Sequence, residues 1–180
     1  MFKRIWQTAL FVIGLSLIAV GQLTAIANWP SFFNSINAVL IVLIFCLFFL
    51  GFRATTWAVL ISGFWLDIFS FNFFGLYLIT LFLVILIADR ISVSLLTNRS
   101  LYSFLLLILV STIIYNFIFQ ILGYFSVDTP SSLFLVQKSF WLTLAYQSAW
   151  SVVCAVLMFN LSALLTRRLQ PFFLEKKTIL

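Results

Sequence analysis

The sequence predicts an all-α integral membrane protein with six transmembrane helices and with both chain ends on the cytoplasmic side. Three observations lead to this prediction. Hydrophobic residues make up 64% of the chain and charged residues only 8%, whereas a soluble domain has about 25% charged residues. The apolar runs lack the two-residue alternation of a membrane β-strand, and helices satisfy backbone groups within each segment, as lipid requires. The basic residues, finally, gather between alternate runs.

The 180 residues are expected to form one transmembrane domain, in which each apolar run is a span. The spans are expected at about 5–27, 38–52, 54–70, 74–88, 101–123 and 140–166. A basic cytoplasmic tail follows at 167–180.

The first run, at 5–27, follows the basic pair Lys3 and Arg4. It is longer than the roughly 7–15 apolar residues of a signal peptide, and further apolar runs follow it. We therefore expect a span rather than a cleaved leader. An uncharged loop with Pro30 then leads to the second run.

The second, third and fourth runs are short for a membrane core of about 30 Å, which takes about 20 helical residues to span. Arg53 marks a very short turn between the second and third runs, and a tight apolar turn precedes the fourth. The fourth run has 13 residues from Leu76 to Ala88, which reach only about 20 Å. Either turn residues such as Phe73 and Phe74 lengthen this run, or the third and fourth runs form a hairpin that stops short of the far surface.

The fifth and sixth runs, at 101–123 and 140–166, are each long enough to cross the membrane. The most polar internal loop, 89–100, precedes the fifth run. A loop with Asp128 and Pro130 joins the fifth run to the sixth.

The orientation follows from the basic residues. With the N-terminus inside and six spans, nine of the ten basic residues fall on the inner side. These nine are Lys3, Arg4, Arg53, Arg90, Arg99, Arg167, Arg168, Lys176 and Lys177. Only Lys138 falls outside. This bias agrees with the positive-inside rule, and a five-span arrangement would move at least one basic cluster outside.

The sequence offers little for catalysis. It has no His, which removes imidazole bases, His metal ligands and the usual Ser and Cys triads, and it has no nucleotide-binding loop. Cys46 and Cys154 lie in separate runs without metal-ligand spacing. The basic residues separate apolar runs rather than forming a phosphate-binding face. We therefore expect no enzyme activity, no metal, no cofactor and no nucleic-acid partner.

Asp67 is the only acidic residue inside an expected span. A carboxylate at mid-membrane costs about 2.5–3.5 kcal/mol, and less near the interface, so we expect it to have a specific role. It is either a polar contact that fixes the third and fourth helices, or a point that binds a partner or substrate, with Asn116 and Gln120 as candidate contacts. Alternatively, it caps the turn by accepting from backbone N–H groups around Ser70 to Asn72.

Other polar positions are also candidates for partner contacts. Asp89 and Arg90 end the fourth run, either as a cytoplasmic docking point or as an interfacial charge pair that stops the helix. The basic tail is expected to bind anionic lipid. In the fifth run, Thr112, Asn116 and Gln120 are spaced by four and form one polar stripe that should face other helices. A transporter would bind substrate with such a stripe, whereas a scaffold would use it for interhelical hydrogen bonds.

Residues 62–78 read SGFWLDIFSFNFFGLYL. A span that ends with Gly63, Leu66 and Asp67, followed by an apolar turn and by Gly75 at the start of the next span, resembles the central signature of the MreD family. The chain length, the basic start, the polar loop after the fourth span and the basic tail also fit. The chain departs from the family in the turn, where family members usually have residues smaller than the phenylalanines found here.

This resemblance implies a non-enzymatic scaffold in the inner membrane, within the elongation machinery of rod-shaped bacteria. The implied partners are an MreC-like protein, an MreB-like filament, RodA and a class B transpeptidase, with which it would organise lateral peptidoglycan synthesis. The resemblance also implies a fold like the S-components of energy-coupling-factor transporters. That fold leaves an alternative open, the substrate-binding membrane subunit of a vitamin-type transporter. Such a subunit would use polar groups such as Asp67, Asn72, Asn116 and Gln120.

Overall fold

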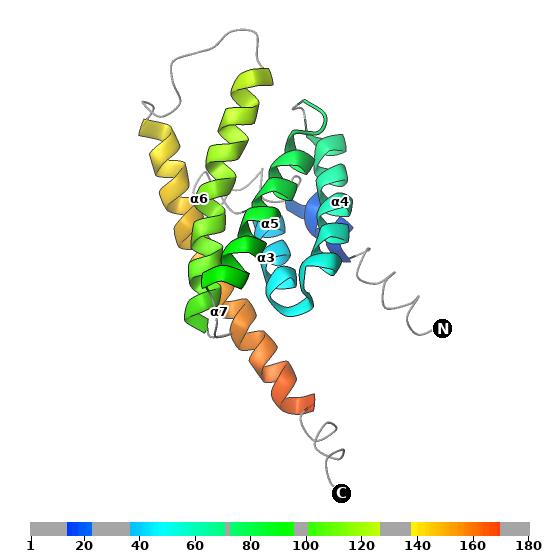
Figure 1. The fold of residues 1–180 in the computed structure, drawn as a ribbon, viewed down its shortest axis with the longest axis vertical. Helices are drawn as coiled ribbons and strands as arrows, with labels where there is room; N and C mark the ends of the chain where they lie inside the picture. The colour runs from blue at the N-terminus through cyan, green and yellow to red at the C-terminus, as the bar shows by residue number, and fades with distance from the viewer. Residues whose placement is uncertain (1–13, 23–36, 71–72, 96–100, 127–137, 170–180) are drawn as a thin grey trace, which may run out of the picture.

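The computed structural model describes residues 14–22, 37–70, 73–95, 101–126 and 138–169, and its regular structure within these ranges is entirely helical (Figure 1). A helical segment at 14–22 precedes five longer helices. These are α3 (Ala38–Leu50), α4 (Phe52–Phe69), α5 (Leu76–Leu95), α6 (Leu101–Ser126) and α7 (Lys138–Leu169). The all-helical prediction is confirmed for this part of the chain. Most of the predicted first span and most of the predicted basic tail lie outside the described residues.

Three of the described helices are long and apolar enough to cross a membrane. The qualifying stretches are Leu76–Ser94 in α5, Leu101–Tyr124 in α6 and Lys138–Asn160 in α7. α3 is a shorter apolar helix. These stretches identify an integral membrane protein, while the number of spans and their orientation stay predictions.

The helix α3 lies at the centre of the bundle. Eight of its 13 residues are buried, and it contacts each of α4, α5, α6 and α7. Its sequence is apolar on every side, which is typical of a helix surrounded by other helices. The fully buried ring of Phe104 in α6 packs against Phe45 and Phe48 of α3, with ring centroids 6.0 and 5.3 Å apart.

A single glycine joins α3 to α4. Gly51 adopts φ +85°, a left-handed conformation that glycine takes without steric cost. Its N–H donates to Leu47 O at 3.2 Å and closes α3, while its own carbonyl accepts from Thr55 N at 3.3 Å and opens α4. The very short turn predicted beside Arg53 is therefore present.

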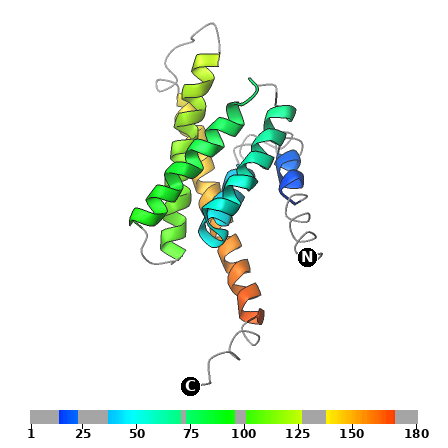
Figure 2. The same cartoon turned by 45° about the vertical axis from the view of Figure 1, so that its right-hand side comes forward.

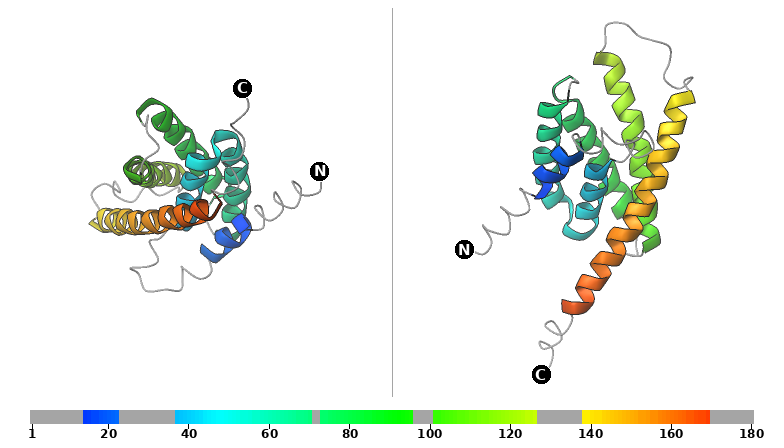
Figure 3. Two further views of the ribbon diagram at one scale, coloured as in Figure 1. Left: turned by 90° about the horizontal axis from the view of Figure 1, so that it is seen from below. Right: turned by 180° about the vertical axis from the view of Figure 1, so that it is seen from behind.

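The helices alternate in direction along the bundle (Figures 1 and 2). The turn at Gly51, the end of α5 and the start of α6 lie at one end, which we call the Gly51 end. The turn between α4 and α5, the end of α6 and the start of α7 lie at the other, the hairpin end. Viewed from behind, α7 extends past its neighbours beyond the Gly51 end (Figure 3).

The charge distribution agrees with this arrangement. Arg53 and Arg90 belong to the Gly51 end, and Arg167 lies in the extended C-terminal part of α7 on the same side, whereas Lys138 begins α7 at the hairpin end. The positive-inside rule requires such a separation of basic residues. On this rule the Gly51 end is the one predicted to face the cytoplasm.

The helix α5 is longer than the sequence suggests. It continues past Asp89 and Arg90 to Leu95 and has 20 residues, about 30 Å at helical rise. The charged pair therefore does not stop the helix, because a helix that leaves the membrane can continue in water with its backbone still bonded. α5 is therefore long enough to cross a membrane, while whether the third and fourth runs cross it fully stays a prediction.

Candidate functional site

The residues singled out in α4 and at the start of α5 come together in one place. We call this group the hairpin lock, and it consists of Gly63 and Asp67 of α4, the connecting Gly75, and Tyr77 and Leu78 of α5. It lies where the two antiparallel helices meet, near the hairpin end.

The Asp67 carboxylate caps the N-terminus of α5. Its Oδ1 accepts from the backbone N–H of Tyr77 at 2.9 Å, and its Oδ2 accepts from the backbone N–H of Leu78 at 3.1 Å. The second and third amides of a helix have no partner within the helix, and a side chain just before the helix usually satisfies one of them. Here a residue of the preceding helix satisfies both.

The burial of Asp67 makes these bonds necessary. Its side chain is only 3% exposed, and a buried carboxylate is strongly unfavourable unless it is hydrogen-bonded. Two amide donors and the positive end of the α5 dipole together stabilise the negative charge. Asp67 and α5 therefore depend on each other.

Gly63 allows the two helices to come close enough for this cap. A Cβ built on Gly63 would lie 2.9 Å from the Leu78 Cα and 3.2 Å from its Cβ. Backbone atoms cannot move away cheaply, so only glycine fits at this position. Gly63 and Asp67 are one helical turn apart and lie on the same face of α4, so both contact Leu78.

Gly75 explains why the cap comes from another helix. It precedes α5 and adopts φ +96°, a conformation that residues with a side chain rarely adopt. The position before a helix is the usual place for a capping side chain, and glycine has none to offer. Asp67 supplies the missing acceptors across the hairpin.

Of the three roles considered for Asp67, the described bonds correspond to the one that fixes the two helices to each other. The backbone N–H of Ser70, one of the amides considered for a local cap, donates instead to Leu66 O at 2.9 Å. Asn72 lies outside the described residues.

A second polar group, which sequence reasoning missed, caps α3. Asn37 Oδ1 accepts from Leu40 N at 3.1 Å, and Gln22 Oε1 accepts from Val39 N at 2.9 Å. Gln22 Nε2 also donates to Asn37 Oδ1 at 3.4 Å. Like α5, this helix takes part of its cap from a preceding helix. Asn directly before an apolar run is a recognised capping signal, but Gln22 carries no comparable signal.

The buried Tyr115 of α6 connects the two capped helix starts. Its side chain lies within hydrogen-bonding reach of Asn37 and near Asp67 and Tyr77. Its ring stacks on Phe119, which in turn contacts the ring of Tyr77 at a centroid distance of 5.1 Å. The starts of α3 and α5 thus meet around one tyrosine.

The polar stripe of α6 faces α7. Asn116 Nδ2 donates to Gln147 Oε1 at 2.8 Å and to Thr112 O at 2.8 Å. Thr112 Oγ1 and Ser151 Oγ are 3.3 Å apart, and both side chains are buried. The stripe therefore packs between helices as expected for Thr112 and Asn116, while Gln120 at its end is exposed. The partners on α7, Gln147 and Ser151, were missed, although their spacing of four matches that of the stripe.

The remaining candidates, Asp89 and Arg90, stand apart from these contacts. They lie in the last part of α5 toward the Gly51 end, about 20 Å along the helix from the hairpin lock. Arg90 is exposed and Asp89 is half-buried.

The contacts of the lock hold two helices together. Asp67 has both carboxylate oxygens engaged by backbone amides. Within the described residues, no group of three His, Cys, Asp or Glu side chains could hold a metal ion. The arrangement fixes the positions of α4 and α5 relative to each other.

Comparison with known proteins identifies one family. The family model described as rod shape-determining protein MreD matches residues 6–167, which is most of the chain. No curated protein and no solved structure matches. The likeness to the S-component fold therefore stays a prediction.

Proposed function

The chain belongs to the MreD family of rod shape-determining proteins, and from this membership we propose that it is a non-enzymatic scaffold of the cell-elongation machinery. In this role it resides in the bacterial inner membrane as a multi-pass protein. It helps to organise lateral peptidoglycan synthesis together with an MreC-like protein, an MreB-like filament, RodA and a class B transpeptidase.

A scaffold is supported by the polar side chains inside the bundle, because they bond one helix to another. Asp67 caps α5, and Asn116 with Gln147 joins α6 to α7. Hydrogen bonds between membrane helices fix their relative positions. A bundle fixed in this way presents a constant surface to its partners, as a scaffold requires.

The same observation disfavours the transporter alternative. A vitamin-binding subunit needs several polar groups that converge on its ligand. Of the residues considered for that role, Asp67 and Asn116 already bond to neighbouring helices, and Gln120 is exposed. If Asp67 and Asn116 turned to a ligand, they would give up the hydrogen bonds that join the helices.

Affinity purification tests the proposal. We would tag the full chain, crosslink cells gently, purify the protein in mild detergent and identify what is recovered. We expect MreC-like, MreB-like or RodA-like proteins. Recovery of a second membrane subunit with ATPases, or of a tightly held vitamin, would contradict the scaffold and support the transporter.

A matched pair of variants makes this test specific. Asp67→Ala weakens the lock and should reduce recovery of the partners and restore rod shape poorly in cells that lack the family member. Tyr102→Phe makes a conservative change at an exposed position outside the lock and should behave as the parent chain. If Asp67→Ala restored rod shape and partner recovery fully, the link between the lock and scaffolding would be wrong.

A further inference from the structure

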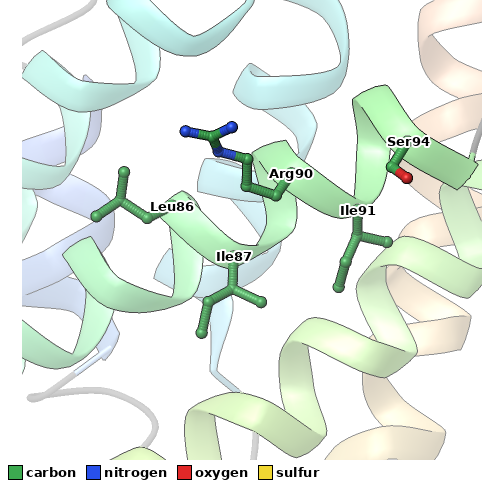
Figure 4. Close-up of a pocket in the computed structure, with 5 residues that line it drawn as sticks. All are labelled: Leu86, Ile87, Arg90, Ile91 and Ser94. Carbon is green, nitrogen blue, oxygen red and sulfur yellow. The ribbon is translucent and has the colours of Figure 1, made fainter.

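An open groove of about 580 Å³ lies along the second half of α5, toward the Gly51 end. Its lining residues are Leu86, Ile87, Arg90, Ile91 and Ser94 (Figure 4). Side chains of a single helix line it, so it is open along its length rather than enclosed. The groove is separate from the hairpin lock, which lies at the other end of the same helix.

The groove has a polar row and an apolar row. Arg90 projects on one side of the α5 ribbon and Ile87 and Ile91 on another, and Ser94 is four residues from Arg90 (Figure 4). Residues spaced by four share a helix face. A ligand that lies in this groove meets a cation and a hydroxyl on one side and aliphatic side chains on the other.

The course of α5 accounts for the opening. α4 and α5 touch at Gly63 and Leu78, where no Cβ fits between them. From this crossing the two helices diverge toward the Gly51 end (Figure 2). The second half of α5 therefore diverges from α4, and among the described residues the groove is lined by α5 alone.

The groove carries an uncompensated positive charge. Asp67 and Asp89 are the acidic residues in the described part of the chain. Asp67 is engaged at the opposite end of α5, and Asp89 is not among the residues that line the groove. Arg90, which is exposed, therefore faces the groove without an acidic side chain opposite it.

From this arrangement we infer that the groove binds an anionic phospholipid, with its phosphate on Arg90 and Ser94 and an acyl chain along Ile87 and Ile91. Arg donors bind phosphate oxygens in a planar, two-pronged geometry. Basic pockets on the cytoplasmic side of membrane helices select anionic headgroups. The Gly51 end is the one predicted to face the cytoplasm. There, the phosphate of a lipid and the first carbons of its acyl chain would lie at the membrane surface beside the groove.

The amphiphilic lining is the reason to prefer lipid over a protein partner. The aliphatic row continues toward the membrane interior. An acyl chain can follow it in that direction, whereas a cytoplasmic protein helix would stay in water and leave most of the row uncovered. The carbonyl end of α5 repels anions, so the phosphate depends on Arg90. This inference is independent of the role in cell shape.

Native mass spectrometry of the full chain in detergent tests the site, with phosphatidylglycerol and phosphatidylcholine as probes. We expect tighter binding of phosphatidylglycerol, and Arg90→Gln should weaken that binding about fivefold, the share of one basic residue at a membrane surface. Arg53→Gln is the matched control, since Arg53 is exposed at the same end but does not line the groove. It should bind phosphatidylglycerol as the parent chain does.

A second variant tests the apolar row. Ile91→Trp fills the groove but keeps Arg90, and it should also lose phosphatidylglycerol while its helical circular dichroism remains. Equal binding by the parent chain and Arg90→Gln would overturn the inference, and it is the result expected if a protein helix is the occupant. Equal affinity for the two lipids, or full displacement of phosphatidylglycerol by millimolar inorganic phosphate, would also overturn it.

Discussion

Gly63 of α4 and Leu78 of α5 lie so close that a Cβ on Gly63 would be 2.9 Å from the Leu78 Cα. One turn further along α4, Asp67 accepts a hydrogen bond from the backbone N–H of the same leucine. The two contacts require each other. Without the small residue the carboxylate would not reach the amide, and without the carboxylate the start of α5 would be uncapped.

Replacing Gly63 with Ala should destabilise the protein. Overpacking costs about 1–3 kcal/mol, and the better helix propensity of Ala offsets about 1 kcal/mol of that. We expect a net loss of about 1 kcal/mol in the free energy of unfolding, measured by titration with dodecyl sulfate in mixed micelles.

Gly123→Ala is the control for this change. Gly123 also lies in a helix, and a Cβ there meets nothing within 4 Å in the described structure. This variant should gain only the better helix propensity of Ala, so it should be at least as stable as the parent chain. Equal effects of the two substitutions would contradict the close approach at Gly63.

Removing the cap should also destabilise the hairpin. Asp67→Ala leaves the Tyr77 and Leu78 amides without their acceptors, and loss of a cap costs about 0.5–2 kcal/mol. Asp67→Asn keeps one acceptor oxygen and should lose about half as much. Thermal unfolding of the detergent-solubilised protein should rank the parent chain first, then Asn, then Ala.

The effect should be specific to this carboxylate. Asp89→Asn removes a half-buried charge in the same helix pair and should change stability by less than about 0.5 kcal/mol. If Asp67→Ala were as stable as the parent chain, the desolvation of the carboxylate would outweigh its two bonds.

Composition and periodicity predict much of this structure. Uninterrupted apolar runs predict helices at 101–123 and 140–166, and the structure has α6 and α7 there. The end of α5 was predicted too early, because the charged pair Asp89 and Arg90 does not interrupt the backbone hydrogen bonds of the helix. A helix continues into water as long as its residues favour it, and the residues up to Leu95 do.

The site could be predicted in part. Asp67 was identifiable as the only acidic residue inside an expected span, and Gly63 and Gly75 through the resemblance to the MreD family. Their common target, the start of α5, was not, since a backbone amide has no signature in a sequence. Gln147 was missed for a related reason: a hydrogen bond between two helices depends on how they are rotated, which periodicity alone does not determine.

The bond between α6 and α7 is open to a double-mutant cycle. Asn116 and Gln147 are joined at 2.8 Å, and hydrogen bonds between membrane helices average about 0.6 kcal/mol, up to about 1.7. Asn116→Ala and Gln147→Ala should therefore couple by about 0.6 kcal/mol in the free energy of unfolding. Gln120→Ala, at the exposed end of the same stripe, should not couple with Gln147→Ala. Coupling at Gln120 would mean that the rotation of α6 differs from the described one.

Gln22 should hold the start of α3 in the way that Asp67 holds the start of α5. Gln22→Leu leaves the Val39 amide without its acceptor, and an unsatisfied buried donor costs about 1–3 kcal/mol. Gln22→Glu keeps an acceptor and places a negative charge at a helix start, where it is favourable, so it should lose less stability than Leu. Hydrogen exchange of the peptide that contains Val39 and Leu40 should be faster in Gln22→Leu and close to the parent rate in Gln22→Glu. Gln120→Leu should leave that exchange unchanged, and equal exchange in all of these variants would mean that α3 is capped by Asn37 alone.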